Sequence, residues 1–168
     1  MPEKFLHSEK NYYAASSNIL VMLEKPIRWE QRFQSFSRAL QRLKRYIDRA
    51  ETLDDLYFEG MVKSFEFTYE MAWNTMKDFL ESYGQTNIYG SRSAIKSALR
   101  FRLIDNGDLW SQMVDERNDT VHSYSEEMVE RIVGNIRLHY FSLFQQFQQT
   151  MEMIREGQIP FIILKIEA

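Results

Sequence analysis

The strongest constraint on the fold is the helical spacing of apolar residues along most of the chain. Between residues 54 and 83 they recur every three or four positions, with no proline and only Gly60 among the glycines. This spacing places them on one stripe of an α-helix, whereas a half-buried β-strand has a period of two. The whole chain has only 6 Gly and 3 Pro, fewer turn-forming residues than an all-β sandwich or barrel of this size uses. The sequence therefore predicts an all-α fold.

The same spacing predicts four further helices. The first is expected over 28–50, and Gly84 is expected to end the helix that follows it. Capping residues then predict a short helix over 92–102 after Ser91, a second after Asp108, and a last long helix from Ser125. The polar stretch 115–124 is expected to interrupt the apolar period between the last two. Three long and two short helices with short connections favour an antiparallel bundle resembling a four-helix bundle.

At 168 residues the chain is long enough for one domain with a real core. We expect an N-terminal extension over 1–25, the bundle over 26–156 and an apolar tail over 157–168. Three conformations stay open for the tail: a strand paired with 19–23, a segment lying on the bundle, or a cover for a partner surface.

Composition narrows the function classes. The absence of Cys excludes disulfide scaffolds, thiolate metal sites and cysteine nucleophiles, and it fits a reducing compartment. A net charge of -3 argues against a global positive field for nucleic acid, so any RNA contact must be local. No apolar run has the length of a membrane span. We therefore expect a cytoplasmic protein with no membrane contact.

Two surface features are expected on the outer faces of the long helices. Arg38, Arg42, Arg45 and Arg49 form a basic ridge on the first, which is either a solvated face or a strip that binds phosphate or a partner. On the second helix, Phe67 and Met71 are expected to point away from the core, which indicates a dimer contact.

His122 is the histidine best suited to chemistry, because it lies in the polar stretch five residues after Arg117. The two would converge only across a kink, a helix end or a subunit interface, since five residues turn an ideal helix by about 140°. An imidazole can move the proton of a ribose 2′-hydroxyl while a guanidinium holds phosphate charge, which suffices for RNA cleavage without metal. The alternative is structural: Arg117 pairs with Glu116 or Asp119.

Several sequence blocks resemble a known family. R-N-D-T-V-H-S-Y at 117–124 is similar to the R-x4-H-x-Y signature of the HEPN superfamily. W-E-Q-R-F at 29–33 and F-E-F-T-Y-E-M-A-W at 65–73 resemble blocks of the nucleotidyltransferase substrate-binding family within it, which includes the HepT toxins. The resemblance covers about residues 26–155.

The resemblance implies a homodimeric helical bundle encoded beside a minimal nucleotidyltransferase. One view of the family makes the bundle the substrate-binding subunit of that enzyme. The toxin–antitoxin view makes it a metal-independent ribonuclease. In that view Arg117 and His122 of two protomers line a cleft and Asn118 supports them, while the nucleotidyltransferase silences the toxin by adding AMP to Tyr124.

The block at 65–73 suggests further contacts. Glu66, Glu70 and Trp73 match it, and Lys77 lies one turn on, so these residues are either substrate or partner contacts or a salt network on a helix flank. Asn74 departs from the family, where Lys is common. No metal-ligand motif is present, and we expect no cofactor.

Overall fold

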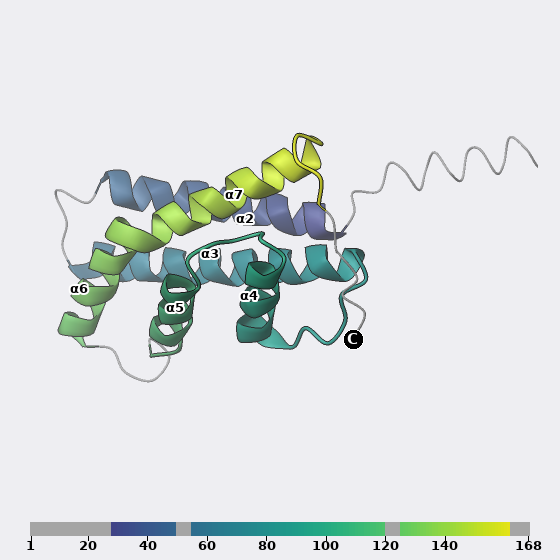
Figure 1. Ribbon diagram of the computed structural model, residues 1–168. Helices are drawn as coiled ribbons and strands as arrows, with labels where there is room; N and C mark the ends of the chain where they lie inside the picture. The colour runs from purple at the N-terminus through teal and green to yellow at the C-terminus, as the bar shows by residue number, and fades with distance from the viewer. Residues whose placement is uncertain (1–27, 50–54, 120–124, 162–168) are drawn as a thin grey trace, which may run out of the picture.

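The computed structural model describes residues 28–49, 55–119 and 125–161, and all regular elements in these ranges are helical (Figure 1). The elements are α2 (Arg28–Asp48), α3 (Asp55–Ser82), α4 (Gly90–Arg100), α5 (Gly107–Asp119), α6 (Glu126–Asn135), the π-helix η1 (Ile136–Tyr140) and α7 (Phe141–Arg155). The all-α bundle predicted from the sequence is confirmed.

Two long antiparallel helices, α2 and α3, form the centre of the bundle (Figure 1). The third long segment, α6–η1–α7, packs on both: α6 contacts α3 and α7 contacts α2. The short helices α4 and α5 lie beside one another at a steep angle to α3, and α5 also contacts η1. This arrangement brings the C-terminal half of α5 against both α3 and the π-helix.

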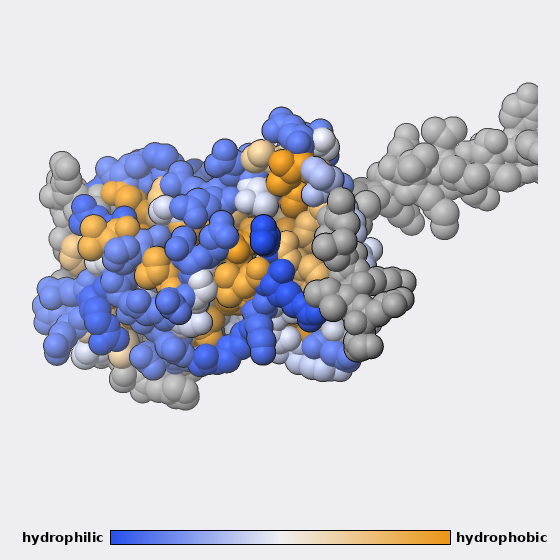
Figure 2. All heavy atoms as spheres, in the orientation of Figure 1, coloured by the Kyte–Doolittle hydropathy of each residue, from blue (hydrophilic) through white to orange (hydrophobic). Residues whose placement is uncertain are grey.

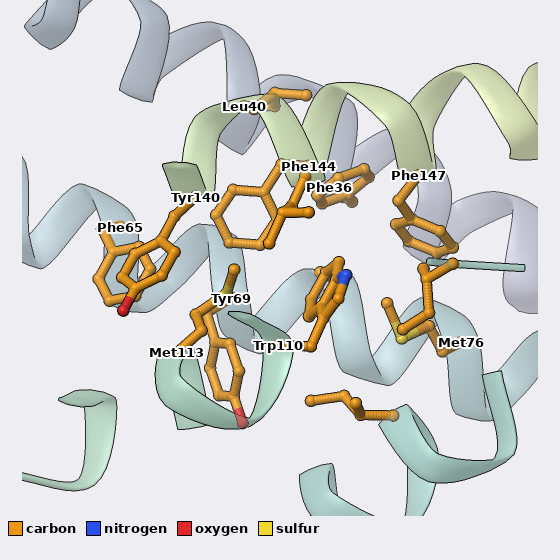
Figure 3. Packing of buried hydrophobic residues seen from close by; sticks show 14 of the residues in the cluster. Phe36, Leu40, Phe65, Tyr69, Met76, Trp110, Met113, Tyr140, Phe144 and Phe147 are labelled. Atoms are coloured by element: carbon orange, nitrogen blue, oxygen red, sulfur yellow. The ribbon is translucent and has the colours of Figure 1, made fainter. Parts of the chain in front are cut away.

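The core is rich in aromatic rings, which come from α2, α3, α5, η1 and α7 (Figure 3). Phe65 of α3 stacks on Tyr140 at 5.5 Å between ring centroids. Trp110 of α5 meets Phe144 of α7 edge-on at 5.7 Å. Truncation of one such fully buried ring to Ala typically costs about 3–5 kcal/mol, so these contacts fix the positions of α5 and α7 on α3.

Helix boundaries differ from the prediction at three places. α4 begins at Gly90 after Tyr89, so Ser91 is not its cap. α5 begins at Gly107, and it continues through half of the polar stretch to Asp119. The last helix is interrupted by the π-helix η1. The spacing of apolar residues in the sequence does not predict the wider turn of a π-helix. Ser125 does cap α6, since its hydroxyl accepts a hydrogen bond from the backbone of Met128 at 3.2 Å.

The beginning of the tail lies on the bundle. The ring of Phe161 packs edge-on against Phe79 of α3 and against Tyr83, which directly follows that helix, at 4.7 and 5.0 Å between centroids. This supports the second of the three conformations considered for the tail. Residues 19–23 and 162–168, which the strand alternative needs, lie outside the described residues, and so does the extension 1–25.

Hydrophilic residues cover most of the face shown in Figure 2, and hydrophobic residues are visible in patches among them. Within the described ranges, no helix combines the length and the hydropathy that a bilayer span requires.

Candidate functional site

Arg117 occupies the last turn of α5, two residues before that helix ends. The apolar residues Trp110, Met113 and Val114 anchor α5 in the core, and the guanidinium is carried to the surface at its end. The side chain of Arg117 is 35% exposed. Arg117 therefore lies at the end of a helix that spans residues 107–119. A helix end is one of the geometries in which Arg117 could meet His122.

The neighbouring residue, Glu116, lies about 100° away around α5 and is buried (relative exposure 7%). Its Oε2 accepts a hydrogen bond from the Tyr140 hydroxyl at 2.8 Å, and its Oε1 accepts one from Asn135 Nδ2 at 2.7 Å. Arg131 approaches Oε1 at 3.7 Å. A buried carboxylate with these partners ties the end of α5 to α6 and η1.

Burial raises the pKa of Tyr140 well above its usual value, and the hydrogen bond to Glu116 and the charge of that carboxylate raise it further. The phenol therefore remains a hydrogen-bond donor to Glu116 throughout the physiological pH range. Glu116 was not singled out from the sequence as a site residue. The available signal was its position three residues after Met113, on the buried side of α5.

Glu70 of α3 faces Arg117. Its Oε2 lies 3.9 Å from Arg117 Nη2 and also accepts a hydrogen bond from Trp73 Nε1 at 3.0 Å. Its Oε1 accepts one from Asn74 Nδ2 at 3.1 Å. Asn74, where the family commonly has Lys, thus holds the carboxylate rather than supplying a cation. The structure brings Glu70 to Arg117, and two neutral donors, Trp73 and Asn74, orient its carboxylate.

The remaining contacts of this surface involve other partners. Arg117 Nη1 lies 3.5 Å from Asn118 Oδ1. Arg92 of α4 binds Asp115 at 2.6 Å. Glu70 is thus a carboxylate that lies within 4.0 Å of the Arg117 guanidinium, whereas the alternative derived from the sequence named Glu116 or Asp119 as its partner.

Tyr69 extends the site inward from Glu70. Its side chain is buried, and burial raises its pKa, while the nearby positive charges of Arg117 and Arg92 act in the opposite direction. Two guanidinium groups, each beside a carboxylate, therefore act on the buried phenol of Tyr69.

Two predicted contact residues lie apart from this cluster. Glu66 pairs with Lys63 at 2.9 Å, and Lys77 with Glu81 at 3.8 Å, each along α3 itself. These pairs match the flank salt network considered above. His122 and Tyr124 lie outside the described residues. Within the described ranges, no three His, Asp or Glu side chains gather as metal ligands.

A family comparison decides the membership of the chain. Residues 31–153 match the model of a family described as nucleotidyltransferase substrate binding protein like. The chain belongs to this family. It is a HEPN protein of the HepT-like kind, as the sequence blocks predicted.

Comparisons with individual proteins agree with this family assignment. Over 88 residues the chain is 31% identical to the protein named probable ribonuclease HepT of Haemophilus influenzae, which covers 50% of this chain and 60% of that protein, less than two thirds of its length. A crystal structure of a protein from Thermus thermophilus matches with a TM-score of 0.61 at 22% identity, covering 71% of this chain and 98% of the other. A mutant of the toxin–antitoxin MntA-HpeT matches with a TM-score of 0.62 at 18% identity, covering 74% and 96%. At these identities the two structures show the shared fold.

Proposed function

We propose that this protein is a HEPN ribonuclease toxin that cleaves RNA without a metal ion and is silenced by a partner nucleotidyltransferase. The observation that carries the proposal is the position of Arg117. Its guanidinium is partly exposed at the end of α5, and the buried side chain of Glu116 holds that helix end in place. The name of the Haemophilus relative and the fold shared with the toxin–antitoxin structures support it.

In the proposed reaction the imidazole of His122 takes the proton of a ribose 2′-hydroxyl, and the 2′-oxygen attacks the adjacent phosphorus. The guanidinium of Arg117 stabilises the charge of the phosphorane. The bond from phosphorus to the 5′-oxygen then breaks, and that oxygen takes a proton from an imidazolium. The products are a 2′,3′-cyclic phosphate and a 5′-hydroxyl, so no oxidant or external nucleophile is consumed.

Glu70 and Asn118 are assigned supporting roles. The 3.9 Å separation of Glu70 and Arg117 is longer than a good charge-assisted hydrogen bond, so an RNA phosphate can compete for the guanidinium. Asn118 lies beside the same guanidinium. We further propose that Arg117 and His122 of two protomers complete the cleft in a homodimer.

The catalytic proposal is tested with labelled RNA in EDTA. Wild type should cleave, and Arg117→Ala and His122→Ala should each lower the rate by about 100-fold or more. His139→Ala, at an exposed histidine of η1, is the matched control and should keep the wild-type rate. Equal cleavage by wild type and His122→Ala, or none by either without the partner, would contradict the proposal.

Regulation is proposed to act through Tyr124, because an AMP group there would put bulk and negative charge beside Arg117. Incubation with ATP and the nucleotidyltransferase encoded nearby should add AMP to wild type and abolish cleavage. Tyr124→Phe should stay unmodified and active. Silencing of Tyr124→Phe to the same extent as wild type would contradict this assignment.

A second candidate is a non-catalytic subunit that presents a substrate to a nucleotidyltransferase, which the description of the matching family favours. It predicts co-purification with that enzyme and transferase activity on a target other than Tyr124. Wild-type RNA cleavage that depends on His122 would argue against it.

A further inference from the structure

The outer face of α2, together with the residue that follows the helix, carries a line of four arginines: Arg38, Arg42, Arg45 and Arg49. Their spacing of four, three and four residues keeps them on one side over about 16 Å of the helix axis. All four are exposed. α2 itself contains six Arg and Lys against two Asp and Glu, in a chain whose net charge is -3.

These four arginines differ from the other cations of α2 in their partners. Arg28 and Arg32 both donate to Asp78 of α3, and Lys44 binds Asp48 at 2.7 Å. Within the described part of the chain, no carboxylate lies within 4.0 Å of a nitrogen of the four arginines. Among the described residues, no carboxylate therefore neutralises their positive charge.

The arginine line borders two adjoining hollows of about 480 and 350 Å³, which share Arg42 and Arg45. The larger is lined in addition by Ser35, Arg38, Ala39, Gln41 and Phe67, and the smaller by Tyr46, Arg49 and Tyr57. We call the two hollows together the arginine groove. Its walls combine guanidinium groups with aromatic rings.

The aromatic wall of the groove is held in place by packing and hydrogen bonds. The rings of Tyr46 and Tyr57 meet edge-on at 4.9 Å between centroids. The Tyr57 hydroxyl donates to the backbone carbonyl of Tyr46 at 3.1 Å, and Arg45 presents a second carbonyl at 3.3 Å. At Gly60 a Cβ would lie 3.0 Å from Tyr46 Cε1, so a glycine there makes room for the ring. The groove is thus a shaped surface between two helices.

The groove adjoins the candidate site across α3. Phe67, at its rim, precedes Glu70 by three residues, and side chains with this spacing are neighbours on a helix surface. Glu70 in turn faces Arg117. One face of α3 therefore separates the arginine groove from the guanidinium of the proposed cleavage site.

We propose that the arginine groove binds single-stranded RNA and holds the segment that flanks the cleaved bond. This rests on the proposed function, in which RNA is the substrate. Guanidinium groups bind phosphate oxygens bidentately, and aromatic rings stack on unpaired bases whatever their sequence. An evenly spaced line of cations suits a polymer with one charge per repeat better than an acidic peptide with irregular charges. The groove then supplies affinity, and Arg117 with His122 supplies the reaction.

The test measures binding separately from cleavage. A fluorescent single-stranded RNA with 2′-O-methyl groups has no attacking hydroxyl, so its anisotropy reports binding alone to the full-length protein. Arg42→Gln with Arg45→Gln should raise the Kd at least about tenfold and reduce the salt dependence of binding by about two phosphate contacts. Lys96→Gln with Arg100→Gln, two exposed residues of α4, changes the net charge equally and should stay within about twofold of wild type.

Other results would overturn the inference. Equal weakening by both double variants would mean a general charge effect, and unchanged binding by the Arg42 and Arg45 variant would remove the groove from the RNA path. Loss of nucleotidyltransferase binding with RNA affinity intact would assign the groove to the protein partner. Light scattering of each variant distinguishes a lost RNA contact from a lost dimer.

Failure of the proposed function has a different signature. Arg117→Ala should bind the 2′-O-methyl RNA within about threefold of wild type if the groove supplies most phosphate contacts. Wild type that binds this RNA through Arg42 and Arg45 but never cleaves an unmodified RNA would contradict the ribonuclease proposal and leave the groove in place.

Discussion

Glu116 is the residue on which the position of Arg117 depends most directly. The two are adjacent in sequence at the end of α5, and Glu116 is buried whereas Arg117 is partly exposed. Because the Glu116 carboxylate is buried among Tyr140, Asn135 and Arg131, the backbone that carries Arg117 cannot move without breaking those contacts. A buried polar network therefore orients an exposed functional group.

Removal of this carboxylate should destabilise the protein. Glu116→Ala leaves the buried Tyr140 hydroxyl without its acceptor, so we expect the free energy of unfolding to fall by about 2–3 kcal/mol in urea titrations. Glu116→Gln retains one acceptor oxygen and should cost about 1 kcal/mol. Equal stability of Glu116→Ala and wild type would show that the network does not hold the end of α5.

Tyr140 should also make the protein sensitive to alkali. Its pKa is raised in the folded state, whereas a tyrosine of the unfolded chain ionises near pH 10. Above about pH 10 the folded state therefore binds more protons than the unfolded state, and the free energy of unfolding falls as pH rises. Tyr140→Phe should lose less stability than wild type between about pH 9 and pH 11 in urea titrations. Tyr89→Phe, at a tyrosine that is 79% exposed, is the control and should follow wild type.

At the scale of elements, α2 and α3 are joined at one end by Asp78. Its side chain is 1% exposed, and its Oδ2 accepts hydrogen bonds from Arg28 at 3.1 Å and Arg32 at 3.0 Å. The two arginines are 71% and 37% exposed. The loss in the free energy of unfolding when this contact is broken therefore depends on whether the buried acid or the exposed arginines are replaced.

Replacement of both Arg28 and Arg32 should lower the free energy of unfolding more than replacement of Asp78. Arg28→Gln with Arg32→Gln leaves a buried carboxylate without a cation, which we expect to lower the free energy of unfolding by about 3–5 kcal/mol. Asp78→Asn leaves two arginines that water can solvate and should cost about 1–2 kcal/mol. Urea titrations measure both, and the reverse order would contradict this account.

At the opposite end, Gly60 sets the approach of the two helices. Gly60→Val would push the added side chain into Tyr46, and the strain should cost about 1–3 kcal/mol. At Gly134 of α6 a Cβ meets nothing within 4 Å, so Gly134→Val is the matched helical control. Thermal unfolding should show a clear loss of stability for Gly60→Val. For Gly134→Val it should show a change in the free energy of unfolding within about 1 kcal/mol.

At the scale of the whole molecule, the outer face of α3 carries the two residues from which the sequence predicts a dimer contact. Phe67 is 51% exposed, as expected from its position on the helix. Met71 is only partly exposed and packs against the core, so the prediction that it points away from the core is wrong. The reason is that residues 67 and 71 differ by about 40° around the helix, which turns Met71 toward a neighbouring element.

The homodimer stays a prediction, and Phe67 provides its test. Phe67→Asp should shift the protein from dimer to monomer in light scattering, because it places a charge in the predicted apolar contact, which borders the arginine groove at its rim. Leu138→Asp on η1, at an even more exposed site (73%), is the control and should remain dimeric. A dimer that survives Phe67→Asp would place the interface on another face.

The sequence by itself determined the helical class, the long core stripes, the cap at Ser125 and the family. These follow from local spacing and from ordered motif blocks, which need no knowledge of distant contacts. Only the tertiary structure decided how the site is assembled, because its contacts join residues far apart in the chain. Glu116 meets residues 19 and 24 positions later, and the carboxylate that faces Arg117 comes from α3. The tertiary structure also made Glu116 the anchor of α5 rather than the ion-pair partner of Arg117 that the sequence allowed, since a carboxylate is stable inside only where folding brings donors to it.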